Sequence, residues 1–432
     1  MTQLARRLGL FDAVMIVMGG IIGSGIFINP YLVARQLPSP IWILGAWAVG
    51  GTVALAGAFI WAELAARKPE LGGQYAYLRE AYHPVVAFMY GWTLLLVIQT
   101  GGMAAVAITF ARYFRPIADL PLSDTAVAVL ALALLTAINC LGVRAGSLTQ
   151  NLFMSLKIAA ISGIVACGFL HPNLTANLAP NVSEGIVVGI PALGAALTPI
   201  AFSYGGWQTA SFMSGELRDV QRDLTRGLVI GILGVIALYV AVNFAYLHVL
   251  GAAGLGNTTT PASTMMRQVL GTRGASLTAV AISLSTFGFL SQGMLTAPRV
   301  YFAMAEDGLF FRALTWVPAR TQAPVAAIAL QGLLAIVIAI SGRYEQILSY
   351  VTSSDFLFFG LTAGALFVFR HRQPGALTHP VPGHPWTTAL FICSCALIVL
   401  GTVVSYPLES LTGWGILASG IPAYLFWRSK PA

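Results

Sequence analysis

Charged residues are scarce in this sequence. Only 9% of its 432 residues are Asp, Glu, Lys or Arg, whereas a soluble globular domain carries roughly 25%. Hydrophobic residues make up 57% of the chain. This deficit of charge excludes a soluble globular protein. It predicts an all-α polytopic membrane protein, because helices satisfy their own backbone hydrogen bonds inside a bilayer.

Cysteine and histidine are also rare. The four cysteines, Cys140, Cys167, Cys393 and Cys395, all lie in apolar stretches, so the sequence predicts neither a disulfide framework nor a zinc ribbon. The apolar stretches hold no His/Asp/Glu cluster and no Ser-His pair suited to metal or nucleophilic chemistry. We therefore expect no metal, no cofactor and no enzymatic activity.

Basic residues are in excess, but they form no basic segment. The net charge is +8, and the Lys and Arg residues are spread over many short loops, which argues against a nucleic-acid partner. Loops on one side of the expected membrane domain hold most of them, for example Arg67, Lys68 and Arg218, while the other side holds few, such as Arg35 and Arg112. The positive-inside rule then places both termini in the cytoplasm. We expect a multi-pass protein of the plasma membrane.

Long hydrophilic intervals are missing, so we expect a single membrane domain over residues 1–432. A transmembrane helix needs about 20 mostly apolar residues. Segments of this kind are centred near Gly23, Val53, Ile98, Leu132, Ile161, Ile200, Ile236, Leu290, Ala335, Phe359, Ala396 and Leu417. They predict twelve transmembrane helices, with a polar outer loop over residues 251–274.

Glycines interrupt two of these segments. The first contains Gly19-Gly20-Ile21-Ile22-Gly23-Ser24-Gly25, and the sixth contains Phe202-Ser203-Tyr204-Gly205-Gly206-Trp207. Glycine weakens a helix interior by about 1 kcal/mol relative to alanine. One interpretation is that both segments unwind beside a ligand site at mid-membrane. The other is that the glycines only let helices pack closely, and the glycines alone favour neither.

Further motifs follow in chain order. They are Ser214-Gly215-Glu216-Leu217-Arg218-Asp219, Ala297-Pro298-Arg299-Val300-Tyr301-Phe302 and Val381-Pro382-Gly383-His384-Pro385-Trp386. Together with Gly23-Ser24-Gly25-Ile26-Phe27 and the motif of the sixth segment, they resemble the amino acid/polyamine/organocation (APC) superfamily. The similarity is greatest to its L-type amino acid transporter branch, and it covers nearly the whole chain.

The resemblance implies a fold and an activity. The fold has twelve helices in a five-plus-five inverted repeat with discontinuous helices one and six. Residues 12–170 would form the first repeat, residues 190–369 the second, and residues 387–428 two additional helices. The activity is secondary transport of L-amino acids by alternating access, frequently by exchange. In the mammalian members of this branch, a cysteine in the outer loop between spans three and four tethers a heavy chain. Residues 114–123 contain none, so we expect the stand-alone bacterial type without a disulfide-linked heavy chain.

The same resemblance assigns a substrate site to the two interruptions. The amino acid carboxylate would bind the backbone of Ser24 and Gly25, and a helix N-terminus suits an anion. Carbonyls of Ile21, Phe202 and Gly205 would face the ammonium, and Ile22, Gly23 and Ser203 complete the unwound segments. The alternative for Ser24 is a helix cap. Phe202 resembles the gating aromatic of the family, and its alternative is a plain core residue.

Lys157 lies near the middle of the fifth segment, where a charge costs at least ~2.5 kcal/mol. Its ammonium would occupy the place where sodium-coupled relatives bind an ion, with Ser291 or Ser283 of the eighth segment as a partner. The alternative is a lysine that snorkels to the outer water.

Other ionisable residues are expected to play structural roles. Glu63, Glu216 and Arg299 lie near inner helix ends, where salt bridges are common. For Asp355, deeper in the tenth segment, we favour an ion pair with a neighbouring helix over a role as counter-ion to a substrate cation. With no other carboxylate near the site, the sequence favours neutral L-amino acids as substrates. Together with the exchange that the resemblance implies and the fixed charge of Lys157, this leads us to expect sodium-independent exchange of neutral L-amino acids. The alternative is a proton- or sodium-driven symporter of amino acids or polyamines.

Overall fold

The computed structural model describes residues 7–37, 39–170, 190–341, 344–375, 380–405 and 407–428. Within these ranges the chain is helical, and its only β contact is an isolated parallel bridge between Leu8 and Leu217. The N-terminal half contains α1 (Leu10–Ile21), α2 (Gly25–Gln36), α3 (Pro40–Arg67), α4 (Gln74–Ala81), α5 (Pro84–Thr93), η1 (Leu94–Ile98), α6 (Gln99–Ala118), α7 (Asp124–Cys140) and α8 (Val143–Phe169).

The second half follows a similar course. It contains α9 (Ile190–Tyr204), η2 (Trp207–Glu216), η3 (Val220–Leu224), α10 (Thr225–Gly256), α11 (Pro261–Thr296), α12 (Pro298–Glu306), η4 (Arg312–Thr315), α13 (Val325–Ser341), α14 (Tyr344–Arg372), α15 (Trp386–Ser405) and α16 (Pro407–Arg428). The prediction of a loop over residues 251–274 is wrong in part. Helical structure extends through most of it, because Gly251 and Gly271 adopt positive φ and let α10 and α11 bend rather than end.

Membrane-crossing segments can be identified by length and composition. Seven helical segments of the described chain are long and apolar enough to cross a bilayer, and the bent pair α1 and α2 makes an eighth. Two further apolar helices, α7 and α13, have 17 residues each, slightly fewer than a perpendicular span needs. The chain is therefore a multi-pass helical membrane protein.

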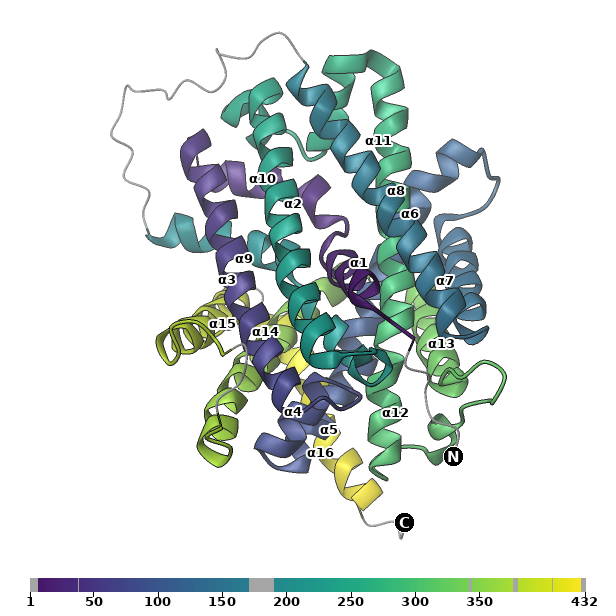
Figure 1. The fold of residues 1–432 in the computed structure, drawn as a ribbon. Coiled ribbons are helices and arrows are strands. Elements are labelled where there is room, and N and C mark those ends of the chain that lie inside the picture. Colours follow the sequence, from purple (N-terminus) through teal and green to yellow (C-terminus); the bar gives the residue numbers. More distant parts are fainter. Residues whose placement is uncertain are drawn as a thin grey trace.

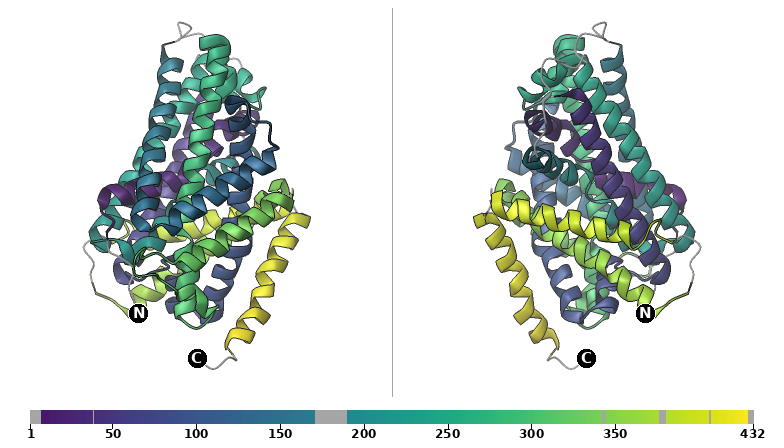
Figure 2. Two further views of the ribbon diagram at one scale, coloured as in Figure 1. Left: turned by 90° about the vertical axis from the view of Figure 1, so that its right-hand side faces the viewer. Right: turned by 90° about the vertical axis from the view of Figure 1, so that its left-hand side faces the viewer.

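Other helices surround the broken first helix (Figure 1). Helix α10 packs along α3, and α11 packs along α8 and α6. Helix α1 contacts α10, α8 and the η2 segment, so it lies inside the molecule. The last two helices pack on the outside, α15 against α14 and α16 against α14 and α5 (Figure 2).

Both ends of the described chain contact the same connecting segment, residues 307–324. Near the start, Arg7 donates a hydrogen bond to Gln322 (3.1 Å). Near the end, the Trp427 ring packs against Phe311 with centroids 5.0 Å apart. The first six and last four residues, which the sequence assigns to the cytoplasm, lie outside the described residues.

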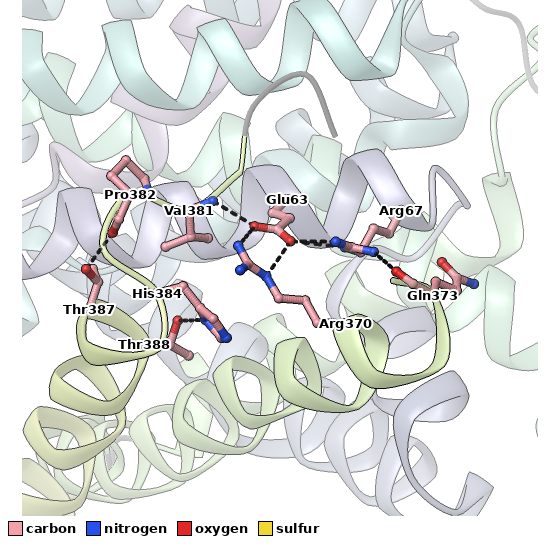
Figure 3. A network of polar contacts seen from close by, with 9 residues as sticks. All are labelled: Glu63, Arg67, Arg370, Gln373, Val381, Pro382, His384, Thr387 and Thr388. Carbon is pink, nitrogen blue, oxygen red and sulfur yellow. Dashed lines mark hydrogen bonds and ion pairs between the residues drawn. The ribbon is translucent and has the colours of Figure 1, made fainter. Parts of the chain in front are cut away.

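The predicted structural salt bridges are confirmed. Glu63 is fully buried and accepts hydrogen bonds from Arg370 (2.6 Å), Arg67 (2.9 Å) and the Val381 N–H (2.7 Å). This network joins α3 to α14 and to the connection before α15 (Figure 3). Glu216 pairs with Arg299 at 2.7 Å, and both side chains are buried.

Candidate substrate site

The first helix is interrupted at the glycine-rich motif, where the resemblance implies a discontinuous helix. Helix α1 ends at Ile21, Ile22 adopts an extended conformation, and α2 begins at Gly25 with its axis bent by 47°. Ser24 precedes α2, but its side chain makes no capping hydrogen bond. The interpretation of Ser24 as a helix cap is therefore wrong. Ser24 is partly exposed at the interruption.

The second interruption follows Tyr204, the last residue of α9. Gly206 has φ +103°, a conformation that favours glycine. A Cβ atom at Gly206 would lie 2.0 Å from the Gly20 carbonyl oxygen. The two interruptions are therefore in direct backbone contact, which only glycine at this position permits.

Two polar side chains link the interruptions. The Asn29 amide donates hydrogen bonds to the Ser203 hydroxyl (2.7 Å) and the Pro199 carbonyl (3.0 Å). The Tyr239 hydroxyl lies 3.2 Å from both the Ile21 and Ser203 carbonyl oxygens. The sequence reasoning missed Asn29 and Tyr239, although a polar group within an apolar segment was the available signal.

A cavity of about 120 Å³ opens between these elements. Seven of the eight predicted substrate-binding residues line it, namely Ile21, Gly23, Ser24, Gly25, Phe202, Ser203 and Gly205. Ile22 does not line it. The Phe202 side chain is 38% exposed, so the alternative of a plain core residue does not hold.

Amide and hydroxyl groups form another part of the cavity wall. Gln99, Gln208, Thr209 and Gln292 contribute to the lining. Gln292 donates to the Thr209 hydroxyl (2.6 Å), and the Gln208 side chain accepts from the Gly206 N–H (3.0 Å). These bonds hold α11 and η2 beside the second interruption. The sequence reasoning did not identify these four residues.

Lys157 of α8 is fully buried and points toward the first interruption. Its ammonium donates a hydrogen bond to the Ile22 carbonyl, so the side chain does not snorkel to water. A Cβ atom at Gly288 would lie 3.6 Å from the ammonium nitrogen, which places Lys157 directly against α11.

The two serines that were considered as partners of Lys157 are occupied elsewhere or unpaired. Ser283 donates to the Ala279 carbonyl (2.8 Å), and the buried Ser291 hydroxyl has no partner among the described residues. The α11 hydroxyl that reaches the interruption is Ser285, which donates to the Gly23 carbonyl (3.2 Å). Lys157 and Ser285 thus bind adjacent carbonyls of the same unwound segment.

Asp355 of α14 also lines the cavity. The ion pair with a neighbouring helix that the sequence favoured is wrong for the described part of the chain, because Asp355 makes no ion pair or hydrogen bond with any side chain there. The sequence could not show this, since the direction of a side chain on a buried helix depends on how that helix packs.

The sequence was compared with protein families and with characterised proteins. The family model described as amino acid permease matches residues 8–425. The large neutral amino acids transporter small subunit 2 of Mus musculus is 28% identical over 450 residues, covering 99% of this chain and 82% of that protein. The b(0,+)-type amino acid transporter 1 of Oryctolagus cuniculus is 30% identical over 415 residues, covering 94% and 84%. The resemblance to the L-type branch is confirmed.

The cavity between two broken helices and the sequence matches over nearly the whole chain lead to one assignment. The chain belongs to the amino acid permease family and is a membrane transporter of amino acids, not an enzyme.

Proposed function

We propose that this protein carries neutral L-amino acids across the plasma membrane by sodium-independent exchange. The observation that carries the proposal is the cavity between the two interruptions, with the Ser24 hydroxyl and the first turn of α2 on its wall. The printed name of one group of relatives, large neutral amino acids transporter, supports the substrate class.

The proposed binding mode uses both ends of the substrate. Its carboxylate lies at the N-terminus of α2, beside Ser24 and Gly25, where the helix dipole and the N–H groups of the first turn favour an anion. Its ammonium faces carbonyl oxygens of Ile21, Phe202 and Gly205. Phe202 covers the bound substrate from the outer side, and the remaining unwound residues, Ile22, Gly23 and Ser203, shape the backbone.

We propose that the Lys157 ammonium replaces a coupling ion. It binds the Ile22 carbonyl, the kind of oxygen ligand that a sodium ion would use in an unwound helix. A fixed positive charge there disfavours a second cation at short range in a low dielectric. The unpaired Ser291 hydroxyl on α11 remains a candidate member of this surrogate site.

The proposed fold has twelve spans, with residues 12–170 and 190–369 as inverted repeats and 387–428 as two added helices. Supporting this division, the broken helix pair α1 and α2 opens the first half, and the broken pair α9 and η2 opens the second. Helices α7 and α13 supply shorter spans at matching positions. Transport by alternating access follows from such a repeat.

We propose that both termini are cytoplasmic and that no heavy chain is attached by a disulfide bond. The contacts of Arg7 and Trp427 with the same connecting segment support termini on one side. None of the four cysteines of the sequence lies between α6 and α7, where the mammalian members of the branch carry their tether.

A counterflow assay tests the proposed function. Purified protein is reconstituted in liposomes preloaded with unlabelled alanine, serine or leucine, and uptake of the same labelled L-amino acid is followed. We expect labelled substrate to accumulate for at least one of the three. If none of the neutral L-amino acids accumulates above protein-free liposomes, the proposed substrate class is wrong.

A further inference from the structure

Among the described residues, Asp355 is the one carboxylate on the wall of the substrate cavity. The proposed binding mode does not use it. It shares the cavity with Ser24 and Gly25 of α2 and with Gly205 of the second interruption. Its neighbour Phe356 lines the same cavity. A carboxyl group therefore borders the space into which a substrate would enter.

The two carboxylates that are fully buried in the described chain have cationic partners. Glu63 binds Arg67 and Arg370, and Glu216 binds Arg299. Asp355 makes no ion pair and no hydrogen bond with a described side chain. A carboxylate at membrane depth is costly without a partner, so an unpaired one marks a functional position. The missing counter-charge can come from the substrate.

In the proposed binding mode, the substrate side chain is the part of the amino acid that can reach Asp355. The carboxylate and the ammonium are accounted for by the N-terminus of α2 and the carbonyls of the interruptions. Beyond them, Ile98, Val106 and Phe356 provide apolar wall, and a Cβ atom at Gly102 would meet nothing within 4 Å. A cavity that combines apolar wall with a carboxyl group matches a side chain with an aliphatic stem and a terminal cation.

We propose that Asp355 is a specificity-determining residue that lets this site accept L-amino acids with a cationic side chain, such as lysine or ornithine, in addition to neutral ones. The proposal rests on the proposed function and extends its substrate class. The Asp355 carboxylate accepts a hydrogen bond from the side-chain ammonium. This contact balances both charges inside the cavity.

The test measures a ratio of two substrates on one protein. Proteoliposomes preloaded with alanine are assayed for uptake of labelled lysine and labelled alanine, for wild type and for Asp355→Asn. We expect the lysine-to-alanine ratio of kcat/KM to fall by about tenfold or more in Asp355→Asn, because lysine loses a charged hydrogen-bonding partner that alanine never had. Asp355→Glu retains the charge and should retain a higher ratio than Asp355→Asn.

Asp119→Asn is the matched control. Asp119 is exposed at the end of α6 with φ +49°, a conformation that asparagine also tolerates. The same change of charge there should leave the ratio at its wild-type value. If Asp355→Asn proves unstable, a competition assay on wild-type protein tests whether the site accepts cationic amino acids. Unlabelled lysine and ornithine should then inhibit alanine exchange.

Contrary results are distinct from failure of the proposed function. The proposal for Asp355 would be overturned, and the proposed function would stand, if wild-type protein exchanged alanine but neither took up lysine nor was inhibited by lysine or ornithine. A folded Asp355→Asn protein that loses alanine and lysine transport by the same factor would also overturn it, because Asp355 would then serve a step common to all substrates. Absence of any amino acid transport by wild type would instead contradict the proposed function itself.

Discussion

At the scale of single residues, Gly25 has two roles. It begins α2, and its backbone borders the place proposed for the substrate carboxylate. A Cβ atom there would already lie 2.9 Å from the Ser203 hydroxyl and 3.3 Å from the Ser203 Cα. Both contacts are closer than atoms of these kinds normally approach, so the position has no room for a side chain.

We predict that Gly25→Leu inserts into the membrane but transports no amino acid, because its side chain would fill the site and separate α2 from α9. Counterflow in liposomes measures the loss. Gly45→Leu, at an exposed position of α3 where a Cβ atom meets nothing within 4 Å, should transport like wild type. Wild-type counterflow by Gly25→Leu would show that substrate does not bind at this interruption.

Lys157 carries the second prediction at this scale. Lys157→Ala removes the donor to the Ile22 carbonyl, and an unpaired buried acceptor costs about 1–3 kcal/mol. We expect most exchange activity to be lost, by about tenfold or more, in the liposome assay. Leu156→Ala, the adjacent and exposed position, is the control and should keep its activity. Full activity in Lys157→Ala would exclude the ammonium as a replacement for a coupling ion.

The sequence allowed part of this site to be predicted. Ser24 and Gly25 stand out because small residues interrupt an apolar segment, and Lys157 stands out as a charge within one. Asn29 and Tyr239 could not be placed, because their partners Ser203 and Ile21 are 174 and 218 residues away in the chain. Only the packing of α2 and α10 brings them together.

At the scale of helices, the interruption after α9 is expected to move. Phe202 lies one turn before it, and its ring is partly exposed in the cavity. A lid helps an exchanger when substrate contacts are stronger in the closed state than in the open one, because a ligand shifts an equilibrium only by that difference.

We predict that Phe202→Ala lowers the maximal exchange rate far more than it weakens binding to the open state. The lost apolar cover is worth at most about 1.5–3 kcal/mol, the range for a fully buried ring. Substrate-induced thermal shift measures binding, and liposome exchange measures the rate. A variant with weakened binding and an unchanged maximal rate would identify Phe202 as a wall of the cavity, not a gate.

The network around Glu63 fixes helices rather than the site. It joins α3, α14 and the chain before α15 through one buried carboxylate (Figure 3). Glu63→Gln would leave two guanidinium groups without a counter-charge. Breaking a buried pair costs about 3–5 kcal/mol, and the partial exposure of Arg370 places this case at the lower end.

We therefore predict a clearly lower melting temperature for Glu63→Gln in detergent. Glu80→Gln is the control, because the Glu80 side chain is 42% exposed in its pair with Lys68 and surface pairs contribute little. Equal melting temperatures for Glu63→Gln and wild type would contradict the structural role of this network.

Helix positions could be predicted where a long apolar segment marks the helix. The segments centred at Val53, Ile98 and Ile161 became α3, the α5–η1–α6 segment and α8. The interval 251–274 was harder, because its polar residues suggested a loop while Gly251 and Gly271 allow helices to continue through bends. Hydropathy identifies segments that are apolar enough to lie in lipid. It does not identify helical segments that are polar.

At the scale of the whole molecule, we propose a carrier with one site that is reached from either side of the membrane. A polytopic membrane protein was evident from the deficit of charge alone. The direction of transport and its coupling are not properties of the composition. They depend on whether the empty carrier can reorient and on whether Lys157 takes the place of a driving ion.

Uptake of labelled alanine measured with and without internal substrate, in sodium and in choline, tests this account most directly. We predict rapid uptake into liposomes loaded with alanine, little uptake into empty ones, and equal rates in the two salts. An imposed inward sodium or proton gradient should drive no accumulation in empty liposomes. Accumulation in empty liposomes driven by either gradient would contradict sodium-independent exchange and establish a symporter instead.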